Sequence, residues 1–188
     1  MKRLLNPSFD YFTLPASSGK NTAGMSLTWF APVSSFTPST GIKDPPETGT
    51  DPGDTVIIST THTFQTGFGF IPLPVDAEVS EMKLKSGGDS GSTTETTEMI
   101  AFLPGDSPEL LELVHNICDE QLIAVQKTAE CANAQFKQAG CSCYPAKATY
   151  EFTSGTKKTG GRKGYVITFT AICTPSFYAG TITEKPTV

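Results

Sequence analysis

Two segments in which apolar side chains occupy every second position most constrain what this chain can fold into. The first is Tyr144 to Thr153, and its apolar positions are Tyr144, Ala146, Ala148, Tyr150 and Phe152. The second is Gly164 to Ile172, and its apolar positions are Tyr165, Ile167, Phe169 and Ala171. A period of two places such side chains on one face of a β-strand. Because the Gly-rich loop Ser154 to Lys163 lies between the segments, we predict a hairpin with one buried face.

Further strands are predicted where β-branched and apolar residues gather between turn signals. These segments are residues 25–30, 55–59, 77–85, 93–103 and 121–128. The turn-forming run Ser86 to Gly91 separates two of them and predicts a second hairpin. Residues 130–140 are polar and Ala-rich, so they predict either a loop or one helical turn.

One segment, Ser107 to Asp119, has the pattern of an α-helix. Ser107 is a good N-cap, and Pro108 suits the first helical position. Apolar residues then recur at helical spacing, at Leu110, Leu111, Val114, Ile117 and Cys118. This stripe has to be buried against other elements, so we expect the helix to lie on a sheet.

The order of strands, one helix and more strands predicts a mainly β fold, a β-sandwich or barrel with one packed α-helix. The length of 188 residues is sufficient for a single domain over 1–188. Within it, residues 34–54 are rich in Pro, Ser, Thr and acidic side chains. We expect them to form a long loop that is extended or mobile.

The charge balance argues against a protein held on nucleic acid. The chain has 14 Lys and Arg against 19 Asp and Glu, a formal net charge of −5, whereas phosphate contacts require an excess of cations. The basic start Met1 to Leu5 is interrupted by Asn6-Pro7 before an apolar run forms. We find no apolar stretch long enough to cross a bilayer, and we expect synthesis in a cytoplasm and no membrane partner.

We expect no catalytic activity, because the residues that carry nucleophilic catalysis lack a matching arrangement. The two histidines, His62 and His115, have no acidic orienter nearby in sequence, and no Gly-x-Ser-x-Gly elbow precedes a helix.

The five cysteines are an odd number and cannot all pair within one chain. We favour free, mostly buried thiols, with no metal and no cofactor. Two alternatives stay open: a zinc site built on Cys131, Cys141 and Cys143, and a disulfide from Cys131 to Cys141 or Cys143.

Several short motifs follow one another in an order that resembles a known family. They are Phe102-Leu103-Pro104-Gly105, Leu122 to Val125, Tyr144 to Tyr150, Ser154-Gly155-Thr156, Gly164 to Thr170 and Pro175 to Ile182. The order resembles bacteriophage tail tube proteins, which are similar in plan to the tube proteins of type VI secretion systems. The resemblance implies a β-sandwich or barrel with one flanking helix, six copies in a ring, and rings stacked into a tube that conducts DNA.

By the same resemblance, the protein is located in the tail of the virion after assembly in the host cytoplasm. Its partners are then copies of itself and other phage tail proteins, and DNA is only in transit through the lumen. Another virion part, such as a tail terminator, a neck protein or a head decoration protein, is the first alternative. A carbohydrate-binding or adhesin module is the second.

Two oppositely charged loops are candidate contacts between subunits. The first carries Asp44, Glu47, Asp51 and Asp54, and the second carries Lys157, Lys158, Arg162 and Lys163. We expect the acidic loop of one subunit to reach the basic loop of a neighbouring subunit or ring. In the alternative interpretation, both are solvated loops within one subunit.

Overall fold

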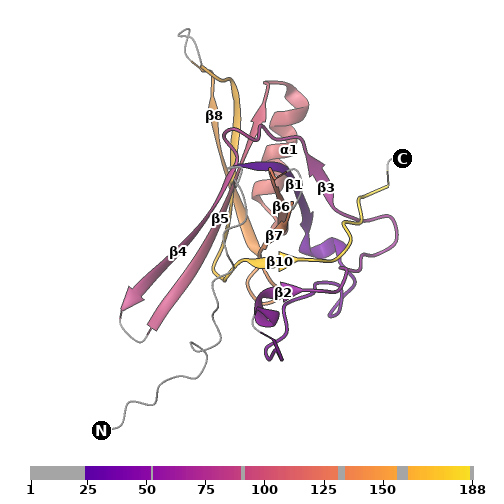
Figure 1. Cartoon of the computed structure of the whole chain (residues 1–188). Coiled ribbons are helices and arrows are strands. Elements are labelled where there is room, and N and C mark those ends of the chain that lie inside the picture. The colour runs from indigo at the N-terminus through magenta and orange to yellow at the C-terminus, as the bar shows by residue number, and fades with distance from the viewer. Residues whose placement is uncertain (1–23, 52, 90–91, 131–133, 156–160, 187–188) are drawn as a thin grey trace.

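The computed structural model describes residues 24–51, 53–89, 92–130, 134–155 and 161–186 (Figure 1). Most of its regular elements are strands. The elements are β1 (Met25–Pro32), η2 (Val33–Ser35), η3 (Asp54–Val56), β2 (Ile57–Ile58), β3 (Ile71–Leu73), β4 (Glu81–Asp89), β5 (Ser92–Pro104), α1 (Pro108–Cys118), β6 (Gln121–Thr128), β7 (Phe136–Ala139), β8 (Ala146–Thr153), β9 (Gly164–Ala171) and β10 (Ser176–Tyr178).

The strands form one sheet in the order β2-β10-β7-β6-β8-β9-β5-β4, and β1 joins it by pairing with β6 and β3. Every pairing is antiparallel except that of β10 with β2. The central strand β6 pairs with β1, β7 and β8. The predicted class, a mainly β sandwich with one packed helix, is confirmed.

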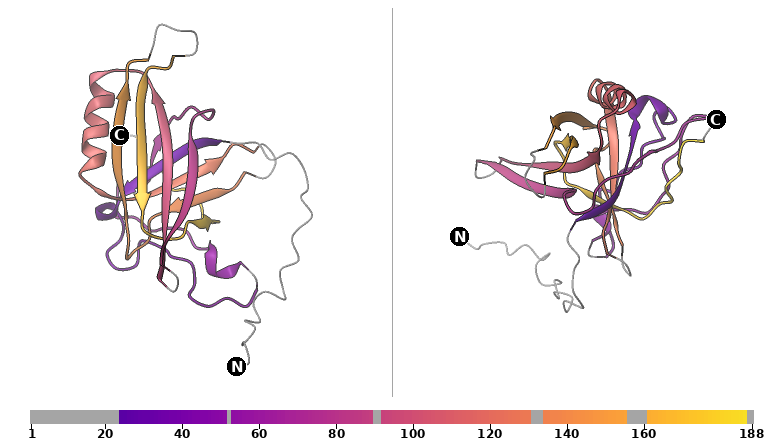
Figure 2. Two further views of the ribbon diagram at one scale, coloured as in Figure 1. Left: turned by 90° about the vertical axis from the view of Figure 1, so that its left-hand side faces the viewer. Right: turned by 90° about the horizontal axis from the view of Figure 1, so that it is seen from above.

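A first hydrophobic core fills the space enclosed by β5, β6, β8, β9 and α1. The alternating residues Tyr165, Ile167 and Phe169 of β9 are buried in it, as predicted. The helix lies beside β8 (Figure 2) and contributes Val114 and Ile117. Burial of large aliphatic side chains at about 1.5–3 kcal/mol each holds this side of the molecule together.

A second core lies on the opposite face of β1 and β6. In β6, Leu122 and Ala124 belong to the first core, whereas Ile123 and Val125 belong to the second. The same division occurs in β1 between Phe30 and Trp29. These two strands therefore form a wall with an apolar layer on each face.

The predicted long loop, residues 34–54, is only partly as expected. Together with the residues that follow it up to Phe70, it forms a cover over the second core, in which Phe36, Ile58 and Phe70 are buried. Backbone bonds fix the cover, among them Thr37 N–H to the Thr63 carbonyl at 3.0 Å. Within residues 34–54, the stretch 46–51 is exposed throughout, but Phe36 and Gly41 are buried. Separated apolar side chains, each alone among polar residues, give no periodic signal, so the sequence pattern predicts a loop there.

Three predicted boundaries are wrong. The strand expected at 55–59 is a 3-10 turn, η3, followed by the two residues of β2. Residues 77–80 form a turn closed by the Ser80 N–H bond to the Asp76 carbonyl at 3.0 Å, so β4 begins at Glu81 and continues through most of the predicted Ser86 to Gly91 loop. Residues 136–139, predicted as loop or helical turn, form β7 between β6 and β10.

The helix begins as predicted, with the Ser107 hydroxyl accepting a bond from the Leu110 amide at 3.3 Å. Its buried face differs slightly from the predicted stripe. Val114 and Ile117 are fully buried, whereas Leu111 is 41% exposed. Leu111→Ala is therefore not expected to cost the about 2–5 kcal/mol of unfolding free energy that truncation of a fully buried leucine costs.

We predict that Ile117→Ala lowers the free energy of unfolding by about 2–5 kcal/mol, because it leaves a cavity in the first core. Leu111→Ala is the matched control and is expected to cost less than about 1 kcal/mol. Urea unfolding followed by circular dichroism measures both. Equal losses for the two variants would contradict the assignment of the helix faces.

Candidate assembly surfaces

The hairpin of β4 and β5 projects from the body of the molecule as a two-stranded arm (Figure 1). The two strands pair from Glu81↔Ile100 to Asp89↔Ser92. β4 pairs only with β5 among the described strands, so its other edge carries unpaired backbone groups. Eight of its nine residues are exposed. The arm thus offers a long free edge for pairing with another chain.

The charges of β4 are balanced, with Glu81 and Asp89 against Lys83 and Lys85. Lys83 pairs with Glu81 at 2.6 Å, and Lys85 pairs with Glu98 at 2.7 Å. Lysines on an edge strand usually discourage pairing with other chains, but here each has an acidic neighbour. Leu84, which is 50% exposed, adds an apolar side chain to the free strand. It lines a groove of about 420 Å³ together with Met25, Met82 and Pro175.

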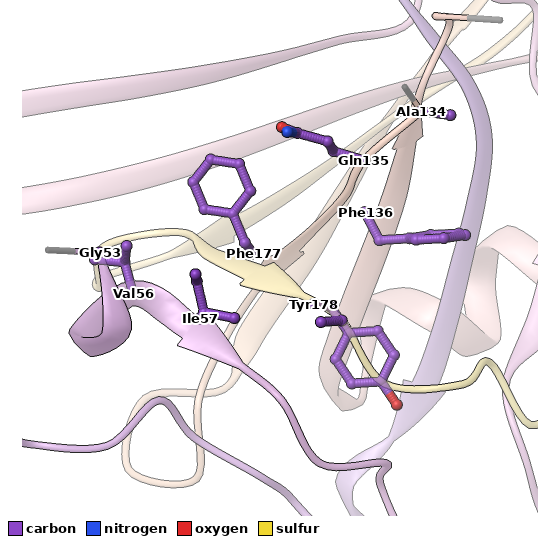
Figure 3. Close-up of a pocket in the computed structure, with 9 residues that line it drawn as sticks. Gly53, Val56, Ile57, Ala134, Gln135, Phe136, Phe177 and Tyr178 are labelled. Atoms are coloured by element: carbon purple, nitrogen blue, oxygen red, sulfur yellow. The ribbon is translucent and has the colours of Figure 1, made fainter. Parts of the chain in front are cut away.

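A second, more apolar groove lies beside β2 and β10 (Figure 3). It has a volume of about 520 Å³ and is lined mainly by Val56, Ile57, Phe136, Phe177 and Tyr178. The Lys137 ammonium group lies over the Phe177 ring at one side of it. An apolar side chain of a partner would fit this groove without the cost of burying a charge.

The four predicted acidic contact residues lie in or beside the exposed segment. Asp44 accepts hydrogen bonds from the amide and the hydroxyl of Ser142, the amide at 3.1 Å. Asp54 accepts bonds from the amides of Thr50 and Asp51, both at 3.0 Å. The hydrogen bond from the Asp51 amide lowers the pKa of Asp54 below its ordinary value, against a smaller raising effect of desolvation. Glu47 and Asp51 are exposed and have no ion pair within the described residues.

The predicted basic residues are divided between two situations. Lys157 and Lys158 lie outside the described residues. Arg162 pairs with Asp76 and Glu78, and Lys163 pairs with Asp106 at 2.7 Å. The structure therefore does not bring the acidic and basic sets together within the described part of one subunit. Arg162 and Lys163 pair instead with Asp76, Glu78 and Asp106, which sequence reasoning missed.

A buried polar network lies under the covering segment, and its centre is His62. The Lys43 amide donates to His62 Nδ1 at 3.0 Å, so the proton is on Nε2, which donates to the Gln138 side-chain oxygen at 2.8 Å. Gln138 in turn donates to the Gly140 carbonyl at 3.0 Å. The His62 ring also stacks on Tyr178, with ring centroids 4.8 Å apart. This network fixes the cover to β7 and β10.

Burial lowers the pKa of His62 below its ordinary value of 6.5, against a smaller raising effect of its bond to Gln138. A lowered pKa in the folded state means that the unfolded chain binds the proton more readily. The stability from neutral His62 is then present above about pH 6.5 and is lost as the pH falls below it.

We predict a melting temperature that decreases from pH 7.5 to pH 5, with a smaller decrease in His62→Gln than in the parent protein. His115→Gln is the control, because His115 is exposed and bonds only to the Tyr150 hydroxyl, at 3.2 Å, among the described contacts. The same acid sensitivity in His62→Gln would exclude His62 as its source.

Neither histidine has a carboxylate hydrogen-bond partner among the described residues. Within the same residues, no group of three His, Cys, Asp or Glu side chains could hold a metal ion. Cys118, Cys141, Cys143 and Cys173 are free thiols, and Cys131 lies outside the described residues. No helix in the described ranges is long and apolar enough to cross a membrane.

Comparisons of the chain with protein families, curated proteins and solved structures found no match. The projecting arm and the apolar groove are suited to contact with another protein chain.

Proposed function

We propose that this chain is a structural subunit that assembles with copies of itself, as a tail tube protein of a bacteriophage does. The observation that carries the proposal is the free edge of β4, nine residues long, on an arm that leaves the body of the molecule. A strand of this length with balanced charge is a template for adding a strand of a second chain.

Among the strands that the structure describes, the sheet has a free edge at each end of its strand order, at β4 and at β2. A contact between different surfaces of identical subunits is a head-to-tail contact, and it generates a ring when the rotation closes. The apolar groove beside β2 and β10 is located at the end opposite β4 in this order. Association of the β4 end of one copy with the β2 end of the next would therefore generate a ring and not a two-fold dimer.

The segment that resembles tail tube proteins contributes the end of β5, α1, and strands β6, β8, β9 and β10. In our proposal this part is the body of a hexameric ring, and stacked rings enclose a lumen for DNA. The net charge of −5 suits a lumen wall that does not retain DNA.

The test is the assembly state of the purified protein. Light scattering over a range of concentrations, with negative-stain microscopy, is expected to find six-fold rings and stacked tubes. Rings that never stack would favour a tail terminator, a neck protein or a head decoration protein. A monomer at every concentration, with no rings, would overturn the proposal.

The charged loops provide a separate prediction about stacking. We expect Glu47→Gln with Asp51→Asn to weaken assembly, because these exposed acids are proposed to meet basic groups of a neighbour. Single exposed pairs contribute roughly 0–1 kcal/mol, but repetition around a ring multiplies them. Assembly of the parent protein is also expected to weaken as salt rises. Sedimentation of tubes measures both, and unchanged sedimentation of the variant would exclude these acids as contacts.

A carbohydrate-binding module is the second candidate, because one exposed aromatic side chain lies among polar groups. Tyr144 is 60% exposed, and it lines a groove of about 390 Å³ with Gln121, Lys147 and Thr170. Sugar rings bind to such aromatic faces with polar groups beside them. Glycan-array binding that is lost in Tyr144→Ala would favour this function, whereas the same variant is expected to leave ring formation intact.

A further inference from the structure

Two cysteines far apart in sequence meet where β7 and β10 continue toward the neighbouring turns. β10 pairs with β7 in antiparallel register, with Phe177 opposite Lys137 and Ser176 opposite Gln138. In such a ladder, each step forward on one strand is a step backward on the other. Extended three steps past the last paired residues, this register leads to Cys173 and Cys141, on the segments that precede β10 and follow β7. A disulfide requires Cα atoms no more than about 7 Å apart, a separation that neighbouring antiparallel segments can provide.

The contacts of the Cys173 thiol agree with this register. The Gly140 amide and the Cys141 side chain both lie close enough to the Cys173 thiol to influence its pKa. Cys141 Sγ also accepts a bond from the Tyr144 amide at 3.2 Å. Both thiols are free and half-buried, and Cys173 lines a surface groove with Tyr144 and Ile172. The two thiols are therefore neighbours, and both are partly exposed to small molecules in solution.

We propose that Cys141 and Cys173 are an oxidisable dithiol that closes to an intramolecular disulfide by exchange with a low-molecular-weight disulfide. The Cys141 thiolate attacks one sulfur of the small disulfide, releases one small thiol and forms a mixed disulfide. The Cys173 thiolate then attacks Cys141 Sγ and releases the second small thiol. The protein loses two protons and two electrons, and the small disulfide gains them.

The order of these steps follows from the surroundings of Cys173. Burial first, and then Cys141 and Asp44 nearby, raise the pKa of Cys173 to about 11. Because burial disfavours the thiolate, closure by Cys173 is expected to be the slow step, and its rate is expected to rise with pH.

The bond would add a covalent link to a surface that is otherwise held by hydrogen bonds, among them that of the Thr97 hydroxyl to the Cys173 carbonyl at 2.7 Å. It joins the turn between β7 and β8 to the segment between β9 and β10. Tyr144 and Ile172, each 60% exposed, flank the two cysteines on these connections. A partner of either proposed kind would meet a more rigid surface in the oxidised protein, but the disulfide itself does not depend on what that partner is.

The test treats the full chain with oxidised glutathione and then blocks remaining thiols. Mass spectrometry is expected to find the loss of two hydrogen atoms without retained glutathione, and peptide mapping is expected to link Cys141 to Cys173. Cys141→Ser and Cys173→Ser each abolish closure, while Cys118→Ser and Cys143→Ser keep it. The melting temperature of the parent is expected to rise by roughly 5–15 °C on oxidation.

Two results would overturn the proposal. One is a link that uses Cys143 or Cys131 in place of either partner. The other is glutathione that stays attached at Cys141 without closure at pH 9, where Cys173 is more strongly ionised. The melting temperatures of the reduced serine variants show whether these variants fold. A variant that folds but forms no disulfide shows that closure requires the missing sulfur.

Discussion

Shortening the β4–β5 arm by two residue pairs is expected to raise the concentration that assembly requires, while the subunit still folds. Removing residues 86–87 and 94–95 deletes the pairs Ser86↔Glu95 and Gly87↔Thr94. Because two residues leave each strand, the remaining side chains stay on the same faces of the hairpin, and the turn residues are kept. The arm becomes about 7 Å shorter. The buried residues of β5 begin at Thr97, so neither core loses a side chain.

The expected size follows from the hydrogen bonds that the free edge would lose. Two residues of an edge offer about two bonds to a neighbouring strand, each with a net value of about 0.5–1.5 kcal/mol. The concentration needed for assembly is then expected to rise roughly tenfold to a hundredfold. The substitutions Thr94→Ser and Glu95→Gln, which keep the length, are the control. Assembly of the shortened variant at the parent concentration would show that the outer arm is not the contact.

Phe70→Ala is expected to lower the free energy of unfolding by about 3–5 kcal/mol. Phe70 is fully buried in the second core. Its ring lies 5.1 Å from that of Phe64 and 5.7 Å from that of His62, measured between centroids. Its backbone also joins the cover to the C-terminal segment, through bonds to Thr183 and Lys185 at 2.9 Å each.

Phe68→Ala is the matched control, because Phe68 is 48% exposed in the same segment. It is expected to change stability by less than about 1 kcal/mol. Denaturant unfolding followed by the fluorescence of Trp29, the one tryptophan of the chain and a member of the second core, measures both variants. If Phe70→Ala cost no more than Phe68→Ala, residues 33–70 would not be a structural part of the fold.

The features that sequence predicted well are those that local patterns determine. The cap at Ser107 and the alternation in Gly164 to Ile172 each involve neighbours within a few residues, so the helix and β9 were predicted closely. The predicted strand 121–128 coincides with β6. Its burial on both faces was not foreseen, because a continuous apolar run does not reveal what covers each side.

The features that sequence missed depend on distant partners. β7 contains Lys137 and Gln138, and the side-chain oxygen of the buried Gln138 is satisfied by His62, which is distant in sequence. Propensity cannot anticipate such a bond. The closeness of Cys141 to Cys173 was missed for the same reason, since the pairing of β7 with β10 brings their flanking segments together. The ion pairs of Arg162 also join segments that no short motif connects.

The wall of β1 and β6 has a consequence for how the molecule opens. Because one strand supplies side chains to both cores, neither core can lose its packing without disturbing the other. The backbone amides of Ile123, Ala124 and Val125 should therefore exchange with deuterium only when the whole chain unfolds. Amides of the β4 edge should exchange orders of magnitude faster, and their slowing in an assembled particle would map the contact directly.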